Sequence, residues 1–155
     1  MSTQILQPIQ IISGGYKTVA TEAASQSFKI GQPVYLVAGL VTACASDGVV
    51  ISGIALQDAT GTPGSKIDVQ VDDGTLVLRG NVYHSTAESA VTAVANRGVK
   101  YALYVSGNLA HVDIGDTDND AIVIISLDQS EVGDTYGRCN FKFITAVLQS
   151  DAAAT

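Results

Sequence analysis

The chain has 155 residues, of which 46% are hydrophobic and 15% are charged, and its formal net charge is −7. This apolar content excludes an intrinsically disordered chain, because disordered chains have too little apolar surface to bury, and the length fits one globular domain. The eight basic residues are scattered along the sequence, which argues against direct binding to nucleic acid.

The first predicted element is an apolar N-terminal segment, residues 4–12, which Pro8 interrupts. Because proline cannot donate a hydrogen bond to a strand ladder, the segment is either an edge strand of its own barrel or an extended arm that pairs with a neighbour. We treat residues 1–15 as an arm, and its candidate partner-binding residues are Ile5, Ile9 and Ile11. Deletion of residues 1–13 is then expected to leave the melting behaviour nearly unchanged.

The body, residues 16–150, is predicted to be a single β-rich domain, a barrel or sandwich of short antiparallel strands. Hairpins are expected at Ala38-Gly39, Asp73-Gly74 and Ser106–Asn108, and the second is the clearest because apolar and polar residues alternate on both sides of it. The predicted strands cover about residues 16–20, 34–37, 40–43, 49–56, 67–72, 76–78, 99–105, 109–114, 121–127 and 138–148.

Two of these strands carry further information. Residues 121–127 form a nearly continuous apolar run, which is typical of a strand buried on both faces. Residues 138–148 are apolar on both faces towards their end, which indicates burial between layers or at a subunit interface. With so few charges on the chain, we expect it to form a homo-oligomer.

One short α-helix is predicted at residues 85–97. Ser85 and Glu88 have the spacing of a capping box, a narrow apolar stripe follows at helical spacing, and Gly98 supplies a left-handed stop. We expect this helix to lie across a barrel opening. No repeat of fixed period is visible, and residues 151–155 are expected to fray.

Candidate metal and catalytic residues are few. Asp116, Asp118 and Asp120 alternate as at the start of a calcium loop, but an EF-hand needs Gly at the sixth position and Glu at the twelfth, where this chain has Ala121 and Leu127. A solvated acidic turn is the favoured interpretation, and a weak Ca²⁺ site stays open. We therefore expect no resident metal or other cofactor.

The remaining reactive residues are expected to be structural. His84 and His111 have no third ligand nearby in the sequence, so a zinc site is not predicted. Cys44 and Cys139 lie in apolar-alternating stretches and are expected to stay reduced and buried. A Gly-x-Ser-x-Gly motif and a phosphate-binding loop are absent, so we do not expect an enzyme.

Localisation is predicted from two further absences. No apolar run approaches the 18 residues of a membrane span, and Met1 to Ser13 does not have the pattern of a secretory signal. We expect folding in the cytoplasm.

Over roughly residues 28–115, turns and small residues recur in a characteristic arrangement: Phe28–Leu36, Asp47-Gly48, Gly53–Ala55, Val69-x-Val71 and Gly80–Val82. This arrangement resembles the capsid decoration (cement) proteins of tailed bacteriophages. The resemblance implies a structural virion protein that binds the outside of an expanded shell, bridges adjacent major capsid subunits and acts as a trimer. The implied partners are the major capsid protein and other copies of the chain, and the implied location is the capsid exterior.

Two alternatives stay open. An exported fimbrial or surface-array subunit would need a signal and usually a disulfide. A small ligand- or carbohydrate-binding barrel would need an aromatic platform, whereas Trp is absent and six tyrosines are dispersed along the sequence: Tyr16, Tyr35, Tyr83, Tyr101, Tyr104 and Tyr136.

Overall fold

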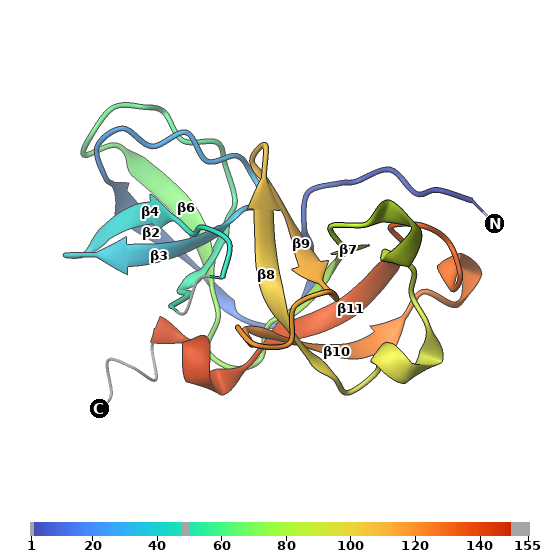
Figure 1. Ribbon diagram of the computed structural model, residues 1–155. Helices are drawn as coiled ribbons and strands as arrows, with labels where there is room; N and C mark the ends of the chain where they lie inside the picture. Colours follow the sequence, from blue (N-terminus) through green and yellow to red (C-terminus); the bar gives the residue numbers. More distant parts are fainter. Residues whose placement is uncertain (1, 48–49, 150–155) are drawn as a thin grey trace.

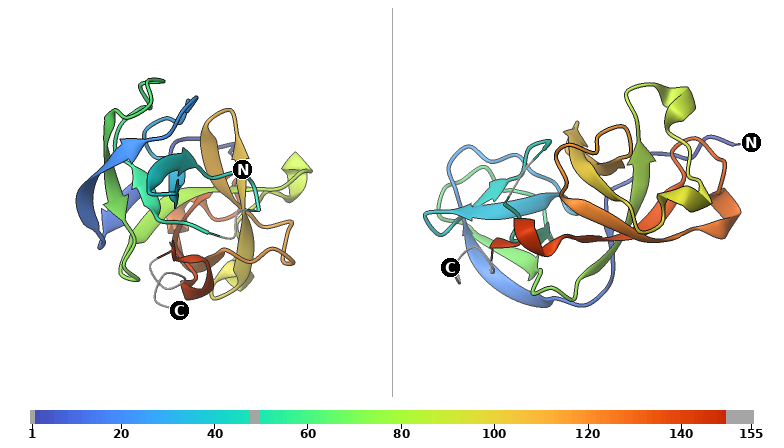
Figure 2. Two further views of the ribbon diagram at one scale, coloured as in Figure 1. Left: turned by 90° about the vertical axis from the view of Figure 1, so that its left-hand side faces the viewer. Right: turned by 60° about the horizontal axis from the view of Figure 1, so that its bottom comes forward.

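The computed structural model describes residues 2–47 and 50–149, and it is mainly β-structure, as predicted (Figure 1). The strands form two closed barrels that lie side by side (Figures 1 and 2). The helical elements between residues 2 and 148 of the described chain are short 3₁₀ turns: Ala87–Ser89 (η1), Val94–Asn96 (η2), Gln129–Glu131 (η3) and Thr145–Val147 (η4).

The first barrel contains five strands in the order β2-β4-β3-β5-β6. Their bounds are Tyr16–Glu22 (β2), Pro33–Val37 (β3), Leu40–Ala43 (β4), Gly53–Ala55 (β5) and Lys66–Val71 (β6). Its interior is a small apolar cluster drawn entirely from this barrel and its loops: Phe28, Val34, Val41, Ala55, Ile67 and Val69.

The second barrel also contains five strands, in the order β7-β11-β10-β8-β9, and the pairing of β7 with β9 closes it. The bounds are Val77–Tyr83 (β7), Lys100–Ser106 (β8), Leu109–Asp113 (β9), Ile122–Leu127 (β10) and Arg138–Phe143 (β11). The N-terminal strand β1, Gln10–Ser13, adds to the outside of β7. A larger apolar cluster fills this barrel and extends to the outer side of the first barrel, where it includes Cys44, Ile51 and Ile54.

The two barrels repeat one strand arrangement. In each barrel, the first strand along the chain pairs in parallel with the third. The other pairings are antiparallel, and in both barrels they join the first strand with the fifth, the second with the third, the second with the fourth, and the fourth with the fifth. The register is the same over the stretches that are paired in both barrels, so there β2–β6 correspond residue by residue to β7–β11. For example, the pairs Val34↔Gly53 and Ala55↔Val69 have the counterparts Tyr101↔Ile122 and Ile124↔Phe141.

Hydrogen bonds from the loops are repeated too. The Gly31 N–H donates to the Ala55 carbonyl at 2.9 Å, and the Gly98 N–H donates to the Ile124 carbonyl at 2.8 Å. Both glycines have a left-handed backbone, with φ of 89° and 77°, which glycine adopts at little cost. Residues that correspond in this way are called equivalent below.

The chain passes from one barrel to the other at Asp73-Gly74, where a hairpin was predicted. The hairpin is wrong, because β6 pairs with β2 and β5 whereas β7 pairs with β1, β9 and β11. The turn itself is real: the buried Asp72 carboxylate accepts hydrogen bonds from the N–H groups of Gly74 at 2.8 Å and Leu76 at 3.4 Å. A local turn signal therefore does not decide which strands pair.

The helix predicted at residues 85–97 is also wrong. The separate turns η1 and η2 take its place, and neither has a side-chain cap at its first residue. Between them, the Ala90 carbonyl accepts from the Tyr136 N–H at 2.7 Å, and Val91 bridges to Thr135. These long-range bonds use backbone groups that a continuous helix would need, so tertiary structure overrides the local propensity.

The N-terminal segment lies along its own chain. β1 is an edge strand on β7, the Gln4 N–H donates to the Thr135 carbonyl at 2.8 Å, and the Asn81 amide donates to the Ile5 carbonyl at 3.1 Å. Ile9 is buried in the larger cluster. Deletion of residues 1–13 should therefore destabilise the protein, contrary to the expectation from sequence. The predicted tail 151–155, and Gly48 of the predicted Asp47-Gly48 turn, lie outside the described residues.

The C-terminal segment returns to the first barrel after β11. Ile51 pairs with it on both sides: its N–H donates to the Val147 carbonyl at 2.7 Å, and its carbonyl accepts from the Gln149 N–H at 2.8 Å. The Asp47 N–H also donates to the Leu103 carbonyl at 2.9 Å, which ties the first barrel to β8. These contacts place the outer side of the first barrel against one end of the second.

Candidate partner-binding surfaces

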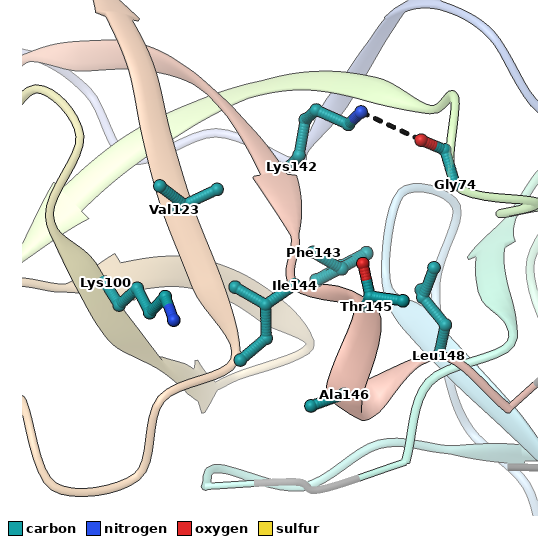
Figure 3. A pocket seen from close by; sticks show the side chains of 9 residues that line it. All are labelled: Gly74, Lys100, Val123, Lys142, Phe143, Ile144, Thr145, Ala146 and Leu148. Carbon is teal, nitrogen blue, oxygen red and sulfur yellow. Dashed lines mark hydrogen bonds between the residues drawn. The ribbon is translucent and has the colours of Figure 1, made fainter. Parts of the chain in front are cut away.

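A groove on the second barrel combines apolar walls with two lysines (Figure 3). Val123 on β10 pairs in register with Lys100 on β8 and with Lys142 on β11, so the three side chains form a row across adjacent strands. The groove has a volume of about 380 Å³, and the rest of its lining is Gly74, Phe143, Ile144, Thr145, Ala146 and Leu148. We call it the basic groove.

The charge of the basic groove is unusual for this acidic chain. None of its lining residues is a carboxylate, and within the described part of the chain neither lysine forms an ion pair. Lys142 is held in place by a 2.8 Å hydrogen bond to the Gly74 carbonyl. Beyond the lining, burial raises the pKa of Asp72, and the charge of Lys142 opposes that shift. The groove therefore offers positive charge beside apolar surface.

A second open surface lies on the outer side of β10. Val94, Arg97, Gly98, Val123 and Ile125 surround a hollow of about 520 Å³, and we call this surface the β10 face. Val94 and Ile125 are 66% and 41% exposed. Residues 121–127 were predicted to be buried on both faces, and this is wrong for the outer one: Ile122 and Ile124 face the core, whereas Ile125 faces solvent.

The third surface is an open end of the first barrel, which we call the mouth. It is a largely apolar pocket of about 470 Å³ lined by Tyr16, Thr18, Leu36, Ala38, Gly39, Ser52, Val71 and Gln149. At its rim, the Gln149 side-chain amide accepts from the Leu36 N–H at 2.8 Å and donates to the Leu36 carbonyl at 2.7 Å. A side chain therefore satisfies the two backbone groups that a neighbouring strand would normally pair.

Three tyrosines that are dispersed in the sequence come together on the second barrel. Tyr83 and Tyr104 stack with ring centroids 3.9 Å apart, and Tyr136 lies parallel to Tyr83 at 6.5 Å. The imidazole of His111 lies 6.3 Å from Tyr83 and is only 2% exposed. Tyr83 and Tyr104 each cover one face of the other ring, so this group is a stacked cluster with the buried His111 beside it.

The predicted partner-binding residues on the N-terminal segment have different surroundings. Ile5 is 77% exposed, Ile11 is half-buried, and Ile9 is buried against Gly31 and Gly80. Ile9 is therefore inaccessible to a partner in this conformation, because it is part of the chain's own core. Of the three, Ile5 is the one that faces solvent.

The candidate metal and reactive residues are built into local structure. The Asp116 carboxylate accepts from Asp118 and Asn119, and the hydrogen bond from the Asn119 amide is the main cause of its lowered pKa. Among the described residues, no group of three or more potential ligands is arranged to hold a metal ion. Cys44 and Cys139 are free and buried, as predicted, and burial raises the pKa of each thiol to about 12.

The sequence alone did not reveal these surfaces. Lys100 and Lys142 are 42 positions apart and become neighbours only because β8 and β11 both pair with β10. The chain matches no protein-family model and no curated protein sequence. In the part of the chain that the structure covers, no helix has the length and apolar character needed to cross a membrane.

Proposed function

We propose that this protein is a structural virion component, a decoration protein that binds the outer surface of an expanded phage capsid and bridges adjacent major capsid subunits as a homo-oligomer, most simply a trimer. The observation that carries the proposal is the basic groove, where Val123 lies between two lysines that have no carboxylate among the lining residues. Such a groove fits an acidic segment of a shell subunit that also carries an apolar side chain.

The residues that gave the resemblance to decoration proteins support the proposal indirectly, since they occupy positions that shape the barrels. Gly31 adopts a left-handed backbone before β3. A Cβ at Gly53 would lie 2.0 Å from the Gln70 carbonyl oxygen, so only glycine fits there. These glycines therefore have a structural role, and the contacts with a shell have to come from the exposed surfaces.

The physical mechanism is mass action. A protein that binds the assembled shell, and not its separated subunits, stabilises the shell by its binding free energy. Several copies held in one oligomer bind more tightly than one copy, because each contact raises the effective concentration for the next. In this proposal Ile5 provides an additional contact, because at 77% exposed it is more exposed than Ile12, at 50%, in the same N-terminal segment.

The test is a protein count on gradient-purified phage particles from the source lysate. We expect a copy number comparable to that of the major shell protein, and loss of particle stability when the protein is stripped by mild denaturant. Absence from the particles would refute the proposal and redirect attention to an exported fibre.

Charge reversal then tests the groove. Lys100→Glu and Lys142→Glu should each reduce binding to stripped particles, most strongly at low salt. Lys66→Glu is the matched control, because Lys66 is exposed, forms no ion pair with the described residues and lies on the first barrel. Equal binding of all three variants would exclude the basic groove as the docking surface.

A further inference from the structure

The repeated architecture allows the two barrels to be compared position by position, and they differ in what covers them. Residues that line the mouth of the first barrel, Tyr16, Thr18, Leu36 and Val71, are all partly exposed. Their equivalents in the second barrel are all apolar and at most 3% exposed: Leu76, Leu78, Leu103 and Phe143. The same end is therefore open in one barrel and sealed in the other.

The first barrel seals the second. Ile54 on β5 points away from its own barrel and, with Ile51 and Cys44, belongs to the apolar cluster of the second barrel. The hydrogen bond from Asp47 to the Leu103 carbonyl lies at the same junction. The outer wall around β5 is thus the surface that covers the end of the neighbouring barrel.

The equivalent wall on the second barrel is uncovered. Val123 is the equivalent of Ile54, and it lies between two hollows: it lines the β10 face together with Gly98, the equivalent of Gly31, and it also lines the basic groove on its other side. Gly31 is buried, and a Cβ atom added to it would lie 2.9 Å from atoms of both Pro8 and Ile9. Gly98 is exposed, and a Cβ atom added to it would have no other heavy atom within 4 Å. Each chain therefore has one wall–mouth contact inside it, one open wall and one open mouth.

We propose that the mouth of the first barrel binds the β10 face of a second copy of the chain, which repeats between molecules the contact that the two barrels make within one. The occupant is a second copy because this chain already contains the matching surface, with the same strand register and an apolar residue at the central position. The inference rests on the proposed self-association and identifies the surfaces that carry it.

The rim of the mouth supports this arrangement. In the sealed barrel, the Leu103 carbonyl accepts from a main-chain N–H of the neighbouring barrel. In the open barrel, the equivalent Leu36 is bound by the side chain of Gln149. An incoming copy can donate a main-chain N–H to the Leu36 carbonyl, as Asp47 does to Leu103, while the Gln149 side-chain oxygen keeps accepting from the Leu36 N–H.

The contact joins two different surfaces, so it is heterologous. Such a contact forms a closed ring if the rotation between copies closes, and an open filament if it does not. A closed ring of three chains is the form consistent with the trimer proposed above.

The test uses blocking substitutions on each surface and needs no shell. Tyr16→Glu places a charge at the mouth and Ile125→Glu places one on the β10 face, and both native side chains are already exposed, at 53% and 41%. In sedimentation velocity, we expect the wild type to form a concentration-dependent oligomer and each variant to be monomeric. Val19→Glu is the matched control: Val19 is 56% exposed on β2 and does not line the mouth, so this variant should associate like the wild type.

Mixing the two blocked variants gives the decisive result. Ile125→Glu keeps an intact mouth and Tyr16→Glu keeps an intact β10 face, so an equimolar mixture should form dimers and nothing larger. A monomeric wild type, or a mixture that stays monomeric while circular dichroism shows both variants folded, would overturn the proposal. No shell is present in this assay, so a monomeric wild type would refute the homo-oligomer but not the binding of single copies to the shell. Loss of shell binding alone would leave the contact between the mouth and the β10 face standing.

Discussion

Lowering the pH should destabilise the protein through a single buried histidine. The His111 imidazole is 2% exposed, its ring lies 6.3 Å from that of Tyr83, and its Nδ1 has no hydrogen-bond partner among the described residues. Burial lowers the pKa of His111 from 6.5 to about 4, because the charged imidazolium is poorly solvated there. The folded protein therefore keeps this histidine neutral at a pH where the unfolded chain protonates it.

The sign and size of the effect follow from proton linkage. Between pH 6.5 and about 4 the unfolded state binds more protons than the folded state, so the stability contributed by neutral His111 is complete above pH 6.5 and is lost as the pH falls towards 4. A shift of one pKa unit corresponds to about 1.4 kcal/mol, so the full loss is about 3 kcal/mol.

The assay is urea denaturation of the wild type and of His111→Phe at intervals between pH 7 and pH 4. The difference in free energy of unfolding between the two proteins isolates His111, since other titrating groups contribute to both. We expect this difference to change by about 3 kcal/mol in favour of the variant as the pH falls. His84→Gln removes the other histidine and controls for the loss of a histidine as such. A difference that stays constant over this pH range would refute the reasoning.

Three further substitutions test the packing. Glu22→Ala should lower the free energy of unfolding by about 3 kcal/mol in urea titrations, because the buried carboxylate accepts three hydrogen bonds from residues 60–61, and Glu22→Gln should recover part of the loss. Ile9→Ala should lower the thermal midpoint, at a cost of about 2–5 kcal/mol, and an unchanged midpoint would contradict its place in the core. Gly53→Ala should abolish folding as judged by circular dichroism, because a Cβ would clash with a main-chain carbonyl, whereas Gly39→Ala, with open space around it, should cost about 1 kcal/mol.

Local signals predicted much of the strand content and two of the hairpins. Ala38-Gly39 and Gly107-Asn108 connect strands that do pair, because a short turn between two apolar runs brings its own flanks together. The same reasoning failed at Asp73-Gly74, where both flanking strands find better partners in separate barrels. Choice of partner is a long-range property, and the alternation of apolar residues reports only that each strand has one buried face.

The repeat was invisible for a related reason. At the matched strand positions, the only identical pairs are Leu36 with Leu103 and Val41 with Val112. What the barrels share is register and backbone hydrogen bonding, which many combinations of apolar residues satisfy. The surfaces were hidden as well, since the row of Lys100, Val123 and Lys142 exists only once three strands are in register.

The second barrel takes apolar core residues from outside itself, whereas the interior of the first barrel does not. Every residue of the first barrel's interior cluster comes from that barrel and its loops, whereas the second barrel completes its core with Ile9, Cys44, Ile51 and Ile54. The first barrel precedes the second in the sequence, so it leaves the ribosome first, and its interior needs no apolar residue from the second barrel. The second half then closes against a surface that has already formed, which shortens the time during which its own apolar residues are open to aggregation.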